Sequence, residues 1–311
     1  MGGNAVGGNA APQWLIDWCR EHLHSTPTRV LFHEQRESAV FGLRLPEQAD
    51  VVVKARRGDG RLGACVEAQR ALAERWSPCP RPRTPVLPVG PLAVHAEELR
   101  AGGGMLPGSS PDVAERYASV FAELMAELAE VRVSVPRPNP RWVRWDHRDE
   151  GLWPSVASLD GRNQDDVPPE VDEIARRVRR RLSAERLPSV LGHADFEAQN
   201  LRWTETGISV VHDWDSLAHQ PEAALVGAAS GGFAGAGPAT LAPVDSSAAF
   251  LERYQRVLGR RFTVTEQEIA WAASVWQAAH HARWEALHGA LPVCGEELRC
   301  QADERLRLAN A

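Results

Sequence analysis

The sequence predicts an α+β protein, in which a small β-rich N-terminal lobe precedes a larger and mainly helical C-terminal lobe. The first observation is a series of β-rich runs parted by polar turns between residues 29 and 55. The second is the helical spacing of apolar residues in most segments from Pro111 onward. A Pro- and Gly-rich stretch, residues 77–104, separates the two patterns and predicts a hinge.

The N-terminal lobe is expected at residues 13–100, and residues 1–12 are interpreted as a flexible leader. Helical spacing of apolar residues predicts a first helix at its start, and a second helix is expected after the third β-rich run. The runs themselves predict an antiparallel meander, with a last strand after the proline-rich segment. The predicted helices are 13–24 and 64–76, and the predicted strands are 29–33, 39–45, 50–55 and 92–96.

The C-terminal lobe is expected at residues 101–311 and is interpreted as helical, with one exception. Residues 201–203 and 208–214 flank the polar turn "TETG", and this pattern predicts a β-hairpin. The predicted helices are 111–130, 169–187, 246–258 and 265–288, and the segments 134–168 and 228–245, rich in Pro, Gly and Asp, are expected to be irregular.

Composition narrows the classes of function. Of the 311 residues, 43% are hydrophobic and 24% are charged, which is close to the averages of globular proteins. A net charge of -6 is too small to predict a nucleic-acid or membrane partner, and the run "RRVRRR" at residues 176–181 is interpreted as a solvated helix face. Five scattered cysteines without a CxxC pair, and the lack of a signal peptide or long apolar window, predict a cytoplasmic protein. None of these features indicates an oligomeric state.

Basic residues are distributed unevenly between the two types. Of the 35 residues that are Lys or Arg, only Lys54 is a lysine. A position that keeps lysine in an arginine-rich chain is a candidate for a compact ammonium on a flexible stem, which a planar guanidinium does not replace. Lys54 ends the third predicted strand, and the alternative is that it survived there by drift.

Acidic and amide residues gather in two motifs on either side of the predicted hairpin. "LGHADFEAQN" occupies residues 191–200, and "VHDWD" occupies residues 211–215. Because a hairpin returns its two ends to about one strand spacing, Asn200 and Asp213 are expected to lie close together. An amide oxygen and a carboxylate suit a magnesium ion that also binds phosphate oxygens. Asp195 is then placed to accept a proton from an alcohol.

The order of these residues along the chain is that of phosphoryl-transfer sites. In kinases an Asp, an Asn five residues later and a metal-binding Asp after a hairpin work with a strand lysine that pairs with a helix glutamate. Asp195, Asn200, Asp213 and Lys54 follow this pattern, and Glu67 is the candidate glutamate.

At these motifs the chain resembles the aminoglycoside phosphotransferase and choline kinase group of the protein-kinase-like superfamily. The resemblance rests on "HADFEAQN", "VHDWDS" and "VVVK", and it extends approximately over residues 28–290. It implies a bilobal protein-kinase-like fold. The chain departs from protein kinases in having no GxGxxG between the first two strands, and from many relatives in having Gln220 before Pro221.

The resemblance also implies roles for individual residues. Asp195 looks like the catalytic base, and Asn200 and Asp213 look like the metal ligands. Lys54 would contact the α- and β-phosphates, and Glu67 would be its ion-pair partner, with Glu74 as a weaker candidate on the same helix.

Three further roles concern the nucleotide and the loops. "HAEELRAGG", residues 95–103, looks like the hinge whose backbone holds the nucleotide base, with Glu97, Glu98 and Leu99 at its centre. His193 is expected to hold the catalytic loop by hydrogen bonds. Asp215 is either a second metal ligand or a carboxylate that stabilises the metal loop.

The function implied is transfer of the γ-phosphoryl group of ATP or GTP, with Mg²⁺, to a hydroxyl of a small molecule. An antibiotic such as an aminoglycoside is the expected acceptor, and a metabolic alcohol or a catalytically silent nucleotide-binding regulator are the alternatives. A protein kinase is disfavoured because no APE-like segment follows "HDWD". Acids for a polycationic acceptor (Asp146, Asp149, Glu150) and tryptophans for an apolar one (142, 145, 153, 271, 276, 284) are both present.

Overall fold

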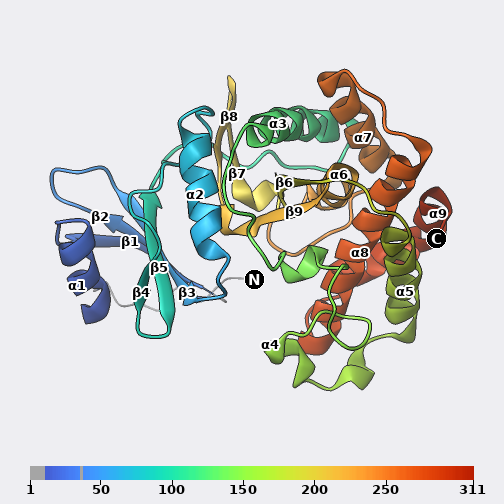
Figure 1. The fold of residues 1–311 in the computed structure, drawn as a ribbon, viewed down its shortest axis with the longest axis horizontal. Helices are drawn as coiled ribbons and strands as arrows, with labels where there is room; N and C mark the ends of the chain where they lie inside the picture. Colours follow the sequence, from blue (N-terminus) through green and yellow to red (C-terminus); the bar gives the residue numbers. More distant parts are fainter. Residues whose placement is uncertain (1–10, 36–37) are drawn as a thin grey trace. The chain divides into compact units, whose positions relative to one another are not determined.

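The computed structural model describes residues 11–35 and 38–311 (Figure 1). The leader predicted at residues 1–12 therefore lies almost entirely outside the described residues. By its contacts the chain divides into two units. The first unit reaches to Gly103 and also contains Val131–Pro136 and Ser209–Asp215, and the second contains Gly104–Glu130, Arg137–Ile208 and Ser216–Ala311. From the sequence alone, both later segments of the first unit were expected in the C-terminal lobe.

The first unit is built on a five-stranded antiparallel sheet with the strand order β1-β2-β3-β5-β4. The meander that the β-rich runs predicted is therefore present. The edge strand β4 was not predicted, because a three-residue run that contains proline is a weak strand signal. The strands are β1 Arg29–Gln35, β2 Ala39–Arg44, β3 Val51–Arg57, β4 Leu87–Val89 and β5 Leu92–Glu98.

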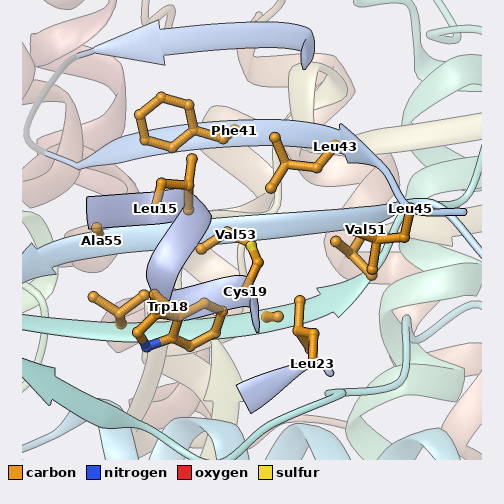
Figure 2. Packing of buried hydrophobic residues seen from close by; sticks show 12 residues of the cluster. Leu15, Trp18, Cys19, Leu23, Phe41, Leu43, Leu45, Val51, Val53 and Ala55 are labelled. Atoms are coloured by element: carbon orange, nitrogen blue, oxygen red, sulfur yellow. The ribbon is translucent and has the colours of Figure 1, made fainter. Parts of the chain in front are cut away.

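One face of this sheet is covered by helix α1, Gln13–His22 (Figure 1). Leu15, Trp18 and Cys19 of α1 are buried against side chains of the central strands, as Figure 2 shows. Alternation along a strand sends every second side chain to the same face, so the residues at every other position of β3 and β5 join this core. The strand residues of the core include Phe41, Leu43, Val51, Val53, Ala55, Val94 and Ala96.

The other face of the sheet carries a group of buried polar side chains. Lys54 on β3 and His95 and Glu97 on β5 occupy the positions between the core residues, and Lys54 pairs with His95 in the strand register. Helix α2, Leu62–Ala73, packs on this face through Gln69, whose amide contacts Glu97. A polar cluster is thus buried between a helix and a sheet.

The second unit is mainly helical, as predicted. It also contains the two-stranded sheet of β6 with β9. Strands β7 and β8 pair in another two-stranded sheet, which is the predicted hairpin, and β8 continues into the first unit. The strands are β6 Ser189–His193, β7 Leu201–Thr204, β8 Gly207–Val211 and β9 Leu217–Pro221; the helices are α3 Pro111–Ala129, α4 Ala157–Asp160, α5 Pro169–Ala184, α6 Glu222–Gly232, α7 Val244–Leu258, α8 Val264–His288 and α9 Val293–Ala309.

Helix α8 is the buried centre of this unit. It starts with a capping box, in which Thr263 and Glu266 satisfy each other's backbone groups, and it ends at Gly289 in the left-handed conformation. Helix α6 packs closely against it. A Cβ atom on Gly227 would lie 2.0 Å from the carbonyl oxygen of Ala270, so only glycine permits this approach.

Three helices of the second unit, α4, α6 and α9, were not predicted. The short helix α4 falls in the segment 134–168 that was expected to be irregular. Part of α6 falls in the segment 228–245 that was expected to be irregular. Its small apolar residues are buried on all sides, so the segment lacks the amphipathic period that identifies a surface helix. In α9, Arg305 interrupts the apolar positions of the buried face, although it is itself 0% exposed. Among the residues that the structure describes, every helix is too short or too polar to span a bilayer.

Candidate active site

The catalytic-loop motif follows strand β6 in the second unit, where Asp195 and Asn200 are in direct contact. The side-chain amide of Asn200 donates to the carboxylate of Asp195 at 2.8 Å and to its backbone carbonyl at 2.9 Å. Asp195 is half-buried, as is Asn200. Because the amide nitrogen of Asn200 is used in this way, its carbonyl oxygen is the atom left to meet a cation.

Further hydrogen bonds hold the rest of this loop. His193 is fully buried, and its Nδ1 accepts a hydrogen bond of 3.2 Å from the backbone N–H of Asp195. Further along, the N–H groups of Ala198 and Gln199 donate to the carbonyls of Phe233 and Gly235, each at 2.9 Å. These hydrogen bonds order the loop that carries Asp195.

The lysine of the first unit lies in a buried ion pair. Lys54 is 8% exposed and Glu97 is 1% exposed, and the ammonium nitrogen lies 3.3 Å from Glu97 Oε1. Burial alone lowers the pKa of Lys54, but the carboxylates of Glu97 and Asp213 outweigh it and hold this pKa above its usual range. Burial alone raises the pKa of Glu97, and the charge of Lys54 outweighs that effect, so this pKa is lowered. Both groups therefore stay charged at neutral pH.

A neutral imidazole completes the surroundings of Lys54. His95 faces it across the strand register and is 2% exposed. Burial lowers the pKa of His95 to about 4, so the ring carries no charge at neutral pH and does not repel the ammonium.

The pairing of Lys54 with Glu67, which the resemblance implied, is wrong. Glu67 is exposed on α2, and the carboxylate beside Lys54 belongs to Glu97 on the neighbouring strand. Glu74 is also exposed and lies 3.6 Å from Arg81. The physical reason is helical periodicity: α2 turns Gln69 toward the sheet, and a residue two positions away points to the other side.

The metal-loop motif belongs to the first unit and its two aspartates differ. Asp213 has a φ of 66°, uncommon for a residue other than glycine, and its side chain is 39% exposed, with Oδ1 3.7 Å from the ammonium of Lys54. The side chain of Asp215 is 10% exposed and pairs with Arg56, and its backbone carbonyl accepts from Arg61. Of the two roles left open for Asp215, these contacts favour the stabilising carboxylate.

Charge neighbours explain the state of Asp215. Burial alone raises its pKa, but the positive charges of Lys54 and Arg56 outweigh this effect and hold the pKa well below its usual range. A carboxylate already neutralised by arginine is a poorer cation ligand than the more exposed Asp213.

The hinge residues have backbone partners within the first unit. The N–H of Glu98 donates to the carbonyl of Arg81 at 3.0 Å, and the N–H of Leu99 donates to that of Asp50 at 2.9 Å. Contact of Glu97, Glu98 and Leu99 with a nucleotide base stays a prediction, and these two amides are already engaged.

Sequence reasoning missed the role of the Glu97 side chain and that of Gln69. A signal for the first was present in the alternation of His95 and Glu97 with apolar Val94 and Ala96, although the predicted strand, 92–96, ended one residue before Glu97. Had the strand been continued by one residue, alternation would have placed His95 and Glu97 on one face. No such signal exists for Gln69, since its partner is 28 positions away.

The acceptor candidates lie in the second unit and are of two kinds. Of the acids, Asp149 is engaged by Arg144 at 3.1 Å and by the N–H of Ser155 at 2.8 Å. Of the tryptophans, Trp153 lies with its ring centroid 5.1 Å from that of Trp276 on α8. The indole of Trp142 donates to the carbonyl of Ala194 at 2.8 Å, which brings one tryptophan to the catalytic loop itself.

A closed metal cage is not part of the described chain: within residues 11–35 and 38–311, no group of three or more His, Cys, Asp or Glu side chains could hold an ion. Magnesium in phosphoryl transfer does not need one, because it is bound by one or two protein oxygens together with phosphate and water. The oxygen donors of Asn200 and Asp213 fit that requirement in chemical type.

Comparison with known protein families gives a match over most of the chain. The phosphotransferase enzyme family matches residues 28–259 of the chain. No curated protein matches its sequence. The family resemblance drawn from the motifs is therefore confirmed.

Solved structures share the fold. An amicoumacin kinase, hAmiN, in complex with AMP-PNP, Ca²⁺ and Ami is similar with a TM-score of 0.67 at 12% identity, over 97% of this chain and 94% of that chain. The aminoglycoside phosphotransferase APH(4)-Ia, as a thermostable mutant with ADP and hygromycin B, has a TM-score of 0.61 at 14% identity, over 96% and 99%. A putative fructosamine-3-kinase from Thermobifida fusca has a TM-score of 0.59 at 16% identity, over 94% and 98%. The chain has the kinase-like fold of these proteins.

Proposed function

Because the chain belongs to the phosphotransferase enzyme family, we propose that it transfers the γ-phosphoryl group of ATP, or of GTP, to a hydroxyl of a small molecule. The observation that carries the proposal is the pairing of Asp195 with Asn200 in one loop of a kinase-like fold. The buried, charged Lys54 supports it, since an ammonium held in this way suits phosphate oxygens.

In this proposal Asp195 accepts the proton of the acceptor hydroxyl. Its carboxylate is half-buried, and Asn200 fixes one oxygen by a hydrogen bond. A positioned base contributes about 100- to 10,000-fold to the rate. His193 acts on the loop, since its ring accepts a hydrogen bond from the backbone N–H of Asp195.

The remaining groups act on the nucleotide. Lys54 binds the α- and β-phosphates, and Asn200 and Asp213 supply oxygen ligands to Mg²⁺. When bound, the ion neutralises developing charge on the phosphate oxygens. Lys54 adds a second positive charge, so the phosphates are oriented from a rigid strand.

The acceptor proposed is a hydroxylated antibiotic such as an aminoglycoside. The support is that neighbours of the same fold were solved with hygromycin B and with spectinomycin. A metabolic alcohol is the second candidate acceptor, on the evidence of a putative fructosamine-3-kinase among the neighbours. A silent regulator is disfavoured because Asp195, Asn200 and Asp213 are all present. All five cysteines are free, which agrees with a reducing, cytoplasmic location.

The test is a screen of acceptors in which the release of ADP or GDP is measured with Mg²⁺. Aminoglycosides, other hydroxylated antibiotics and small amino alcohols form three groups, each with ATP and with GTP. Release that depends on an acceptor supports the proposal, and mass spectrometry of the acceptor must show the mass of one added phosphoryl group. Nucleotide binding without turnover in all three groups would favour the silent regulator.

A further inference from the structure

We propose that Glu97 of strand β5, and not a carboxylate of helix α2, is the residue that positions the ammonium of Lys54, with Gln69 of α2 holding Glu97 from behind. The inference rests on the proposed function, because the positioned ammonium is the group that binds the nucleotide. Its consequence is that the ion pair belongs to the sheet and does not depend on where α2 lies.

The register of the two strands places both charges. β3 and β5 pair from Val51 opposite Glu98 to Arg57 opposite Leu92 with no shift, whereas the pairing of β1 with β2 contains an irregularity. In this register Glu97 stands opposite Val52, two residues before Lys54 on the same face. The backbone hydrogen bonds of the sheet therefore fix both ends of the ion pair.

The helix residue in contact with Glu97 is an amide and not an acid. Gln69 is 1% exposed, and its amide nitrogen donates to Glu97 Oε2 at 2.7 Å and to the carbonyl of Pro80 at 2.9 Å. An amide donor orients a carboxylate but supplies no negative charge for the ammonium. Glu97 thus offers one oxygen to Lys54 and the other to Gln69.

Helix geometry excludes the carboxylate of Glu67. Residues of an α-helix advance about 100° each, so Glu67 points about 200° away from Gln69 around the axis of α2. Glu67 is accordingly exposed. A displacement of α2 would disturb the Gln69 bond, but the Glu97 partner of Lys54 would remain.

Loss of Glu97 would leave Lys54 with a second carboxylate within reach, because Asp213 Oδ1 lies 3.7 Å from its nitrogen. A buried ammonium without its main partner is strongly unfavourable, so the ammonium moves toward Asp213. If Asp213 also binds Mg²⁺, the two cations then compete for one carboxylate.

The test compares Glu97→Gln with Glu67→Gln, which makes the same change at an exposed position. We expect Glu97→Gln to lower kcat/KM for nucleotide on the order of 100-fold, the size associated with a misplacement of about 1 Å. Glu97→Gln should also raise the Mg²⁺ concentration at which nucleotide binding, measured by calorimetry, is half-maximal. This concentration would not change if Glu97 had only a structural role. Glu67→Gln should stay within about twofold in both measurements, well under the tenfold that corresponds to about 1.4 kcal/mol.

A second pair of variants keeps the proposal open to disproof if Glu97→Gln does not fold. Glu97→Asp retains the charge but shortens the side chain, and should lose nucleotide affinity and kcat/KM at an unchanged melting temperature. The double variant Glu97→Gln with Gln69→Glu returns a carboxylate to the cluster and should recover part of the binding lost in Glu97→Gln.

The activity of the wild type and the nucleotide affinities of the variants distinguish a failure of this inference from a failure of the proposed function. Absence of phosphoryl transfer by the wild type, with nucleotide still bound, contradicts the function, and the calorimetric comparison of variants still decides the inference. Full nucleotide affinity in Glu97→Asp or Glu97→Gln, or a loss in Glu67→Gln equal to that in Glu97→Gln, overturns the inference. A wild type that binds no Mg-nucleotide contradicts both.

Discussion

The polar cluster of the first unit and the catalytic loop of the second unit are ordered by different forces. Around Lys54 charges balance charges: Glu97 and Asp213 face the ammonium, and Arg56 faces Asp215. In the catalytic loop, the amide of Asn200 donates to the Asp195 carboxylate, and the backbone N–H of Asp195 donates to the ring of His193. The difference implies that the structure of the first region depends on the balance of charges, whereas the structure of the catalytic loop depends on hydrogen bonds and packing.

The largest expected effect tests the catalytic loop by removing its only proposed proton acceptor. Asp195→Asn keeps the shape of the side chain, so nucleotide binding should persist, while kcat falls about 100- to 10,000-fold. Steady-state kinetics and calorimetry measure the two quantities. Asp303→Asn, the same change at an exposed site on α9, is the control and should be neutral. Unchanged kcat in Asp195→Asn at saturating substrates would remove this residue from the base role.

The next largest effect is expected in the polar cluster of the first unit, from a substitution of Lys54 that keeps the positive charge. Lys54→Arg replaces a compact ammonium by a wide planar fork in a site that is 8% exposed. We expect kcat/KM for nucleotide to fall on the order of 100-fold, because the phosphates are misplaced. The reverse swap, Arg57→Lys at the exposed end of β3, is the matched control. Activity of Lys54→Arg within about threefold of the wild type, about 0.7 kcal/mol, would mean that lysine is at this position by drift.

Packing behind the catalytic loop provides the third test. Backbone N–H groups of the catalytic loop donate to the carbonyls of Phe233 and Gly235, which directly follow α6. Helix α6 in turn contacts α8 at Gly227. In Gly227→Ala the new Cβ would lie 2.0 Å from a backbone oxygen, so the free energy of unfolding should fall by about 1–3 kcal/mol.

The matched control for this packing test is Gly63→Ala. Gly63 lies on α2, and no atom lies within 4 Å of the place that its new methyl group would take, so the substitution should raise stability by about 0.5–1 kcal/mol. Denaturant unfolding followed by circular dichroism gives both values. Equal effects at Gly227 and Gly63 would contradict the close approach of α6 to α8.

The smallest expected effect is the loss of thermal stability at acid pH that follows protonation of Glu97. The folded pKa of Glu97 is lowered, so its contribution to stability is present above the ordinary carboxyl pKa of about 4.3 and is lost as the pH falls through the folded value. The melting temperature of the wild type should therefore drop below about pH 4 more steeply than that of Glu97→Gln, which has no carboxyl to titrate. Each 1 kcal/mol corresponds to about 2–4 °C in a domain of this size. Parallel melting curves from pH 7 to pH 3 would contradict the charged state assigned to Glu97.

Local patterns were sufficient for much of this protein. Strands with β-rich runs and helices with apolar periodicity were predicted because each signal lies within one element. The motifs at residues 191–200 and 211–215 led to the family, and the family match confirmed it. The roles of Asp195, Asn200 and Asp213 stay predictions, since sequence order shows which groups are present but not what they bind.

Tertiary structure decided the points that depend on partners distant in the chain. The carboxylate beside Lys54 comes from Glu97, 43 positions later, because β3 and β5 are neighbours in the sheet while the helix between them turns Glu67 to solvent. Likewise α6 is helical because it is enclosed by other helices, and its own residues carry no amphipathic period. The periodicity of apolar residues belongs to one segment and can be recognised in the sequence. The partner of a buried charge depends instead on which strands and helices pack together.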